Sequence, residues 1–138
     1  MQFRAGTVAV VRDERGRVLA FERADRPDQW QLPQGGLDVG ERPVDGVWRE
    51  LEEETGLTRR DVRLVDEYPE WTAYEWPDGV RKGNRLGQAQ RWFFFEPRGD
   101  IEPRPDGVEF TAWKWVEVDW LIDQVVEFRA ASYRRVLR

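Results

Sequence analysis

The stretch "RELEEETGL", residues 49–57, decides the fold of this chain. Pro43 stands before it at a position that favours the start of a helix, and Gly56 stands where helices commonly end. The sequence therefore predicts a helix over about residues 43–55. Four carboxylates crowd into this helix, although like charges three or four residues apart destabilise it. They are Glu50, Glu52, Glu53 and Glu54.

The predicted helix has an apolar face and, beside it, an acidic one. At about 100° per residue, the apolar face that docks on the core consists of Val44, Val47, Trp48 and Leu51. Glu50, Glu53 and Glu54 fall together on the neighbouring face, whereas Glu52 points elsewhere. Converging carboxylates suit a hard cation such as Mg²⁺ or Mn²⁺. A run of glutamates is more often a solvated helix face, so the helix alone leaves both interpretations open.

The spacing around the helix is more specific than its charge. Read from Gly35, the chain follows G-x₅-E-x₇-R-E-U-x-E-E-x-G-U, where U is a bulky apolar residue. The residues at these positions are Gly35, Glu41, Arg49, Glu50, Leu51, Glu53, Glu54, Gly56 and Leu57. This pattern resembles the Nudix box. The resemblance implies an enzyme that hydrolyses a nucleoside diphosphate linked to another group, with two or more Mg²⁺ or Mn²⁺ ions in its active site.

The resemblance also implies roles for these residues. Glu53 and Glu54 would bind metal, with the carbonyl of Gly35 as a possible backbone ligand. Glu50 would be a metal ligand, the base that activates water, or both, and Arg49 would orient the glutamates by bidentate pairing. The catalytic set is then Arg49, Glu50 and Glu53. Glu41 would support the site from the preceding loop. Further along the chain, Glu109 matches the glutamate that completes the metal site.

The similarity to one branch of the family extends beyond the box. "WQLPQGG" (30–36), "GQAQRWFFF" (87–95), "EFTAWKWV" (109–116) and "VVEFRAASYRRV" (125–136) occur in the order typical of that branch. It contains the bacterial RNA 5′-pyrophosphohydrolases and the dinucleoside polyphosphate hydrolases. The resemblance therefore covers the chain from about residue 3 to residue 136.

The same comparison implies a set of substrate-binding residues. Arg4 matches an arginine near the phosphates, although "FRAGTV" departs from the "YRPNVG" form common in the branch. Val126, Phe128 and Arg129 match positions that hold a nucleobase and the adjoining phosphate. Phe128 also fits the apolar stripe of the last helix, so a place in the core is an equal alternative. Tyr74 matches an aromatic residue at the mouth of the cleft.

Composition excludes several other kinds of site. The chain has 138 residues and a net charge of −5, so it offers no general basic surface for nucleic acid, and we expect no DNA partner. Arg81, Lys82 and Arg85 form a local cation patch that could attract polyphosphate, or a solvated loop. With no histidine and no cysteine, the chain excludes histidine-based triads, histidine-bound zinc and disulfides.

The predicted elements indicate an α+β protein. We expect strands at 7–11 and 18–22 joined as a hairpin, a short strand within 30–36 that leads into a Pro/Gly loop, and one or two strands within 61–75. A long loop at 76–88 precedes strands at 89–97 and 109–118, and one amphipathic helix closes the chain from Asp119. The resemblance implies a Nudix-like α/β/α sandwich with a mixed sheet, a central acidic helix and a C-terminal helix.

Length and hydropathy bear on organisation and location. A chain of 138 residues is one ordinary domain, so we expect a single Nudix domain over 1–138. No apolar run approaches the roughly 20 residues of a membrane span, and no signal-peptide pattern opens the chain. We expect a cytoplasmic protein without a membrane partner.

Several functions fit these observations. The leading expectation is a hydrolase that converts 5′-triphosphate or 5′-diphosphate RNA ends to 5′-monophosphates. The nearest alternative is a hydrolase of dinucleoside polyphosphates, such as diadenosine tetra- to hexaphosphate. A non-catalytic nucleotide-binding module is an alternative of another class, and the complete glutamate set argues against it. A purely structural role would leave the spacing of Gly35, Glu41, Arg49 and Gly56 unexplained.

Overall fold

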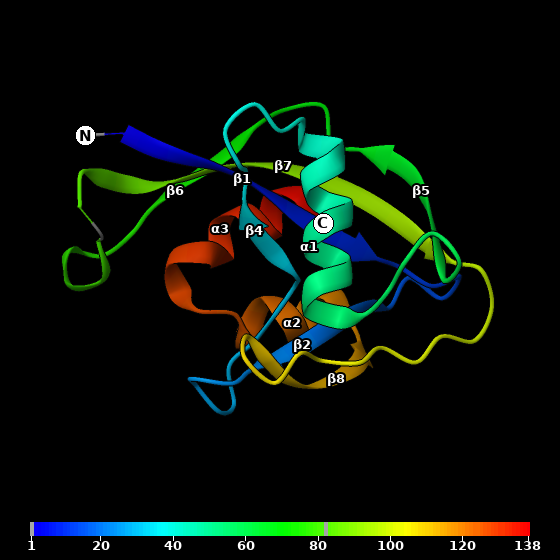
Figure 1. Cartoon of the computed structure of the whole chain (residues 1–138). Coiled ribbons are helices and arrows are strands. Elements are labelled where there is room, and N and C mark those ends of the chain that lie inside the picture. The colour runs from blue at the N-terminus through cyan, green and yellow to red at the C-terminus, as the bar shows by residue number, and fades with distance from the viewer. Residues whose placement is uncertain (1, 82) are drawn as a thin grey trace.

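Two β-sheets and three α-helices make up the computed structural model, which describes residues 2–81 and 83–138 (Figure 1). The strands are β1 (Gln2–Val11), β2 (Val18–Arg23), β3 (Trp30–Gln31), β4 (Gln34–Gly36), β5 (Val62–Glu67), β6 (Thr72–Glu75), β7 (Arg85–Pro97) and β8 (Phe110–Val116). The helices are α1 (Pro43–Thr55), α2 (Val118–Gln124) and α3 (Glu127–Leu137), with a 3₁₀ turn, η1 (Asp78–Val80). Among the described residues, no helix is both long and apolar enough to cross a membrane.

The larger sheet is mixed and the smaller one is antiparallel. In the larger sheet the order is β4-β1-β7-β5, and β6 also pairs with β7. β1 and β7 run parallel along the whole of β1, whereas the other pairs in this sheet are antiparallel. The smaller sheet has the order β3-β2-β8. The long parallel pair forms the centre of the molecule.

Alternation along β1 divides the core into two apolar clusters. Val8 and Val10 pack with residues of α2 and α3, whereas Ala9 and Val11 pack with Val47 and other apolar residues of α1. Successive side chains of a strand point to opposite faces, so one central strand serves both clusters. This arrangement of helices on either side of a mixed sheet confirms the predicted α+β sandwich (Figure 1).

The central helix has the predicted bounds, and its ends explain them. Pro43 occupies the first turn, after Arg42 in an extended conformation. Gly56 ends the helix with φ +73°, a left-handed conformation that favours glycine, and its N–H donates to the carbonyl of Glu52 at 2.9 Å. The last turn contains acidic residues and no basic one, which the helix dipole disfavours. The acidic residues therefore do not stabilise helix α1, so the stability of the helix does not explain why they are there.

Three expectations about strands and loops are wrong. The predicted hairpin of residues 7–11 and 18–22 is reduced to a single bridge between Arg12 and Val18, because β1 and β2 enter different sheets. Gly35 and Gly36 lie in strand β4, not in a loop. The loop predicted at 76–88 is also shorter, because β7 begins at Arg85 and continues its pairing with β1.

The closing helix differs from the prediction as well. It is broken into α2 and α3 by Val125 and Val126, whose backbones are extended. β-branched side chains lose rotamer freedom in a helix, so two adjacent valines favour a break there. The break turns Val126 and the first residues of α3 toward the candidate site.

Candidate active site

A cleft of about 780 Å³ lies at the end of β1 that carries Arg4. Residues of both sheets, of α1 and of the start of α3 line it. Its carboxylates are Glu50, Glu54 and Glu109, with Glu127 from the start of α3. Its arginines are Arg4, Arg23, Arg26, Arg85 and Arg129. The cleft therefore combines groups that attract cations with groups that attract phosphate.

Glu54 is the most deeply buried carboxylate of the cleft. Its side chain projects from the last turn of α1, the residue is only 5% exposed, and its Oε1 atom has no hydrogen-bond partner within the described residues. Burial, followed by the charges of Glu50, Glu109 and Asp106, raises the pKa of Glu54 to about 9. A buried carboxylate oxygen without a partner is costly, and a bound cation would remove that cost.

Glu50 lies one turn before Glu54 and also faces the cleft. Burial raises the pKa of Glu50, although the hydrogen bond from Arg49 opposes the rise. The α-carbon of Gly35 faces this carboxyl so closely that an added Cβ would lie 2.1 Å from the Glu50 carboxyl carbon. The carbonyl of Gly35 in turn lies against Gly6 of β1, where an added Cβ would lie 2.7 Å from it. A side chain at residue 35 would therefore displace the Glu50 carboxyl, and a side chain at residue 6 would meet the backbone carbonyl of Gly35.

Arg49 joins the loop before α1 to the glutamates of the helix. It binds Glu41 in a bidentate manner, with Nε–Oε2 and Nη2–Oε1 distances of 2.8 Å, and donates to the carbonyl of Gly36 at 3.0 Å. Its Nη1 donates to Glu50 at 2.8 Å and to Glu53 at 3.4 Å. The hydrogen bond from Arg49 lowers the pKa of Glu41 to about 2. The geometry thus supports the orienting role expected for Arg49.

Glu53 lies apart from the other predicted ligands. Its side chain is 57% exposed, contacts Arg49 and does not line the cleft. The described residues contain no group of three or more acidic, histidine or cysteine side chains close enough to hold an ion. Mutual repulsion between the carboxylates and the hydrogen bond from Arg49 to Glu50 keep these acidic side chains apart. The all-oxygen set of Glu50, Glu54 and Glu109 nevertheless fits a hard divalent cation, because the buried Glu54 oxygen is left without a partner.

The arginines of the cleft come from four separate segments. Arg4 packs on the α-carbon of Gly36, where an added Cβ would lie 2.1 Å from the guanidinium. Arg23 is paired with Asp25 at 2.9 Å. Arg26 and Arg85 are exposed and have no carboxylate partner within the described residues. These side chains surround the space in front of the glutamates.

The aromatic residues of the cleft differ partly from the prediction. Phe128 is half-buried, lines the cleft and belongs to neither apolar cluster, so the alternative of a core residue is wrong. Tyr74 is only 7% exposed and does not line the cleft. It lies behind Phe128 at a ring distance of 5.4 Å, because alternation along β6 turns it inward. Trp76, two residues later, lines the cleft instead.

Arg129 is held in place by a chain of hydrogen bonds. Its Nη1 donates to Gln31 Oε1 at 2.9 Å, and its Nε donates to the Tyr74 hydroxyl at 3.4 Å. That hydroxyl donates to Gln88 Oε1 at 3.0 Å. Val126, at the N-cap of α3, also lines the cleft. Four of the five predicted substrate residues thus line one cavity, and the fifth, Tyr74, supports it from behind.

The predicted cation patch is only partly present in the cleft. Arg81 pairs with Asp78 at 2.7 Å, and Arg85 lines the cavity. Lys82 lies outside the described residues.

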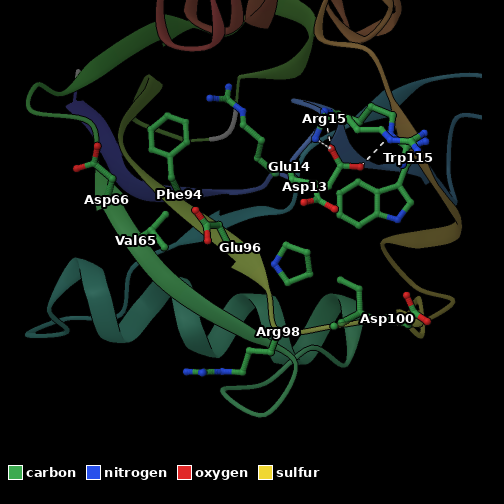
Figure 2. A pocket seen from close by; sticks show the side chains of 15 residues that line it. Asp13, Glu14, Arg15, Val65, Asp66, Phe94, Glu96, Arg98, Asp100 and Trp115 are labelled. Atoms are coloured by element: carbon green, nitrogen blue, oxygen red, sulfur yellow. Dashed lines mark hydrogen bonds and ion pairs between the residues drawn. The ribbon is translucent and has the colours of Figure 1, made fainter.

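A second hollow, of about 970 Å³, lies at the opposite end of β1 (Figure 2). Its lining mixes acidic and basic side chains, and several of these charges are already paired. Asp13 binds Arg17 at 2.8 Å, and Glu96 binds Arg63 at 2.6 Å. No residue of α1 lines this hollow. Its other carboxylates, those of Glu14, Asp66 and Asp100, are exposed to solvent, so this hollow, although larger than the cleft, contains no deeply buried carboxylate like that of Glu54.

The sequence matches one family model over almost its whole length. The NUDIX domain model matches residues 2–136. The chain belongs to the NUDIX family. The predicted family is thereby confirmed, and the chain is a Nudix hydrolase, a class that generally uses divalent metal ions.

Two curated relatives of this Nudix hydrolase are similar over nearly the whole chain. A protein of Rhodospirillum rubrum named RNA pyrophosphohydrolase is 38% identical, and the match covers 99% of this chain and 86% of that protein. A protein of the same name from Zymomonas mobilis is also 38% identical, with 99% and 94% covered.

Solved structures show the same fold at lower identity. The E. coli dihydroneopterin triphosphate pyrophosphohydrolase has a TM-score of 0.81 at 20% identity and covers 99% of this Nudix chain, which covers 95% of it. A C. elegans Ap4A hydrolase has a TM-score of 0.74 at 17% identity, with 96% and 93% covered. These structures support the fold of the Nudix chain.

Sequence reasoning missed several residues of the cleft. Arg23, Arg26, Gln34, Trp76 and Gln88 line it but were not predicted. They lie outside the Nudix box, on strands and loops whose approach to α1 depends on the tertiary fold. Trp76 lies one residue beyond β6, so the two-residue period that turns Tyr74 inward gives no signal for the place of Trp76 in the cleft.

Proposed function

We propose that this Nudix hydrolase converts 5′-triphosphate or 5′-diphosphate RNA ends to 5′-monophosphates with the help of divalent cations, Mg²⁺ or Mn²⁺, two or more in each active site. The observation that carries the proposal is the cleft itself, a cavity of about 780 Å³ lined by Glu50, the buried Glu54 and Glu109 on one side and by arginines on the other. Two of these arginines, Arg26 and Arg85, have no carboxylate partner within the described residues. The relatives named RNA pyrophosphohydrolase favour an RNA 5′ end as the substrate.

The carboxylates would hold the cations. Glu50, Glu54 and Glu109 supply oxygen ligands, and the buried Glu54 oxygen is the group that most needs a cation. A bound divalent ion would polarise the phosphoryl group and lower the pKa of a bound water. Glu53 would join this set by a rotation of its exposed side chain, and the Gly35 carbonyl would contribute from β4.

The protein's own groups would orient the reactants and move the proton. Water attacks a phosphorus atom, the bridging P–O bond breaks, and pyrophosphate or phosphate leaves. Glu50 would accept the proton of the attacking water, because it faces the cleft and burial raises its pKa toward the range useful for a base. Arg49 holds the carboxyl of Glu50 in place through the 2.8 Å hydrogen bond.

The arginines and aromatic rings would bind the remainder of the substrate. Arg4, Arg85 and Arg129 would contact phosphate oxygens. Phe128 and Trp76 would stack on a nucleobase, an interaction tolerant of base identity. Dinucleoside polyphosphates present the same phosphates and bases, so they are the second candidate substrate. We place the activity in the cytoplasm, on a single domain over residues 1–138.

The test is a product assay with Mg²⁺ or Mn²⁺ that offers 5′-triphosphorylated RNA and diadenosine polyphosphates in parallel. The E50Q variant removes the base, and E52Q is the matched control, since Glu52 lies exposed on the same helix away from the cleft. We expect E50Q to lower kcat by about 10²–10⁴-fold with little change in KM, and E52Q to match the wild type.

Each result of this assay decides a different point. Release of pyrophosphate from RNA at the higher kcat/KM supports RNA end processing, whereas preference for the dinucleotides selects the second candidate. Activity on neither substrate would favour a nucleotide-binding module. The E53Q variant, tested alongside, shows whether Glu53 reaches the reaction centre, and retained turnover would remove it from the catalytic set.

A further inference from the structure

The loop that precedes β8 is organised around one carboxylate oxygen. Asp106 Oδ1 accepts three backbone N–H groups: from Val108 at 3.0 Å, from Glu109 at 2.9 Å and from Phe110 at 3.1 Å. The N–H of Gly107 donates to the carbonyl of Phe110 at 2.8 Å, and Gly107 has φ +79°. One side chain thus sets the backbone path through Glu109.

The same loop is tied to the end of helix α1. The N–H of Arg104 donates to the carbonyl of Thr55 at 2.7 Å, and the N–H of Asp106 donates to the carbonyl of Glu54 at 3.2 Å. Helix ends leave carbonyl groups without partners, so the loop satisfies groups that would otherwise need water. Glu109 is therefore fixed relative to the backbone of Glu54, although 54 residues of sequence lie between them.

We propose that Asp106 is a positioning residue that holds Glu109 in line with Glu54 for a divalent cation. The proposal rests on the proposed function only in its use of Glu109 as a metal ligand. Hydrogen bonds from three consecutive amide groups to one acceptor atom fix a backbone more firmly than any single bond. Partners behind a metal ligand commonly change metal affinity about 10–100-fold when they are removed.

Direct ligation by Asp106 is the competing explanation, because its charge is close enough to raise the pKa of Glu54. The two roles differ in what asparagine can replace. The D106N variant keeps an Oδ1 acceptor for the three N–H groups but loses the charge, whereas D106A loses both. Positioning requires the acceptor, and ligation requires the charge.

The experiment measures Mn²⁺ binding by calorimetry for the wild type, D106N, D106A, E109Q and the double variant D106A/E109Q. We expect D106A to weaken binding about tenfold and D106N to stay within about twofold of the wild type. E109Q should weaken binding, and adding D106A to it should cost no more than about twofold, because the residue that Asp106 positions is already disabled. Circular dichroism at the assay temperature checks that each variant is folded.

Several results would overturn the proposal. These are wild-type binding by D106A, equal losses in D106N and D106A, additive losses in the double variant, or wild-type binding by E109Q. If D106A fails to fold, D106N and E109Q still decide the matter: D106N must bind as the wild type does and E109Q must not. Turnover distinguishes failure of the proposed function from failure of the role proposed for Asp106. A wild type that is inactive on both substrates can still show the expected pattern of Mn²⁺ binding.

Discussion

At the scale of single residues, Glu54 belongs to the candidate site but lowers the stability of the folded protein. Its carboxyl is buried beside other carboxyls, at the end of a helix whose dipole already disfavours negative charge. No other ionisable side chain within the described residues is both this buried and left with an unpartnered oxygen. The free energy of folding should therefore depend on the state of this one group.

We predict that the metal-free protein becomes less stable as the pH rises from about 5 to 9. The pKa of Glu54 is about 9 in the folded protein and near 4.5 in the unfolded chain. Between these values the folded state keeps a proton that the unfolded state has lost, so the free energy of unfolding falls as pH rises. Thermal unfolding in a chelating buffer would show a Tm that decreases over this range.

The E54Q variant and added Mn²⁺ serve as controls for this prediction. Glutamine carries no titrating proton, so E54Q should show a flatter dependence of Tm on pH. Mn²⁺ binds the ionised carboxylate, so it should raise the Tm of the wild type most at high pH and that of E54Q much less. Parallel pH profiles for the two proteins would contradict the assignment.

At the scale of an element, helix α1 depends on Arg49 to hold its acidic face together. We predict that R49K lowers the free energy of unfolding by about 1–3 kcal/mol, because lysine cannot reproduce the bidentate pair with Glu41 together with the bonds to Gly36 and Glu50. Urea denaturation gives this quantity. R42K is the matched control at the N-cap of the same helix: Arg42 forms an exposed pair with Asp45, so its loss should cost less than about 1 kcal/mol.

The break between α2 and α3 makes a second prediction at this scale. It places Phe128 at the cleft wall outside both apolar clusters. We predict that F128A raises KM for nucleotide substrates by about 5- to 150-fold, the equivalent of about 1–3 kcal/mol of lost stacking, with little change in Tm. F3A, which removes an exposed ring outside the cleft, should leave KM unchanged. A large fall in Tm with unchanged KM would return Phe128 to a structural role.

Over the whole molecule, charge is segregated even though the net charge is −5. Arginines gather around a cleft whose base is acidic, so a polyanion is attracted locally. We predict that kcat/KM for 5′-triphosphorylated RNA falls as salt increases from 50 to 200 mM, and that R26A and R85A each reduce the slope of the log–log plot by about 0.7. R15A is the control, because Arg15 lies at the far hollow of Figure 2.

How much of the structure the sequence predicts depends on how far apart in the sequence the interacting residues lie. The bounds of α1 follow from Pro43 and Gly56, which act within one helical turn, and the Nudix box follows from fixed spacings. The hairpin expectation is wrong because neighbouring strands can enter different sheets, which turn residues do not reveal. The positions of Tyr74 and Trp76 depend on which face of β6 meets α3, a property of packing that the two-residue period leaves open.

The cleft draws on both ends of the described chain, with Arg4 on β1 and Arg129 on α3. During synthesis, a ribosome-bound chain that has exposed β1, β4 and α1 still lacks the side chains that complete the phosphate and base contacts. Such a chain presents a cluster of glutamates without the segments that would select a substrate. Onset of activity should therefore coincide with release of α3 from the exit tunnel, and the glutamate cluster of a shorter nascent chain should not turn over substrate.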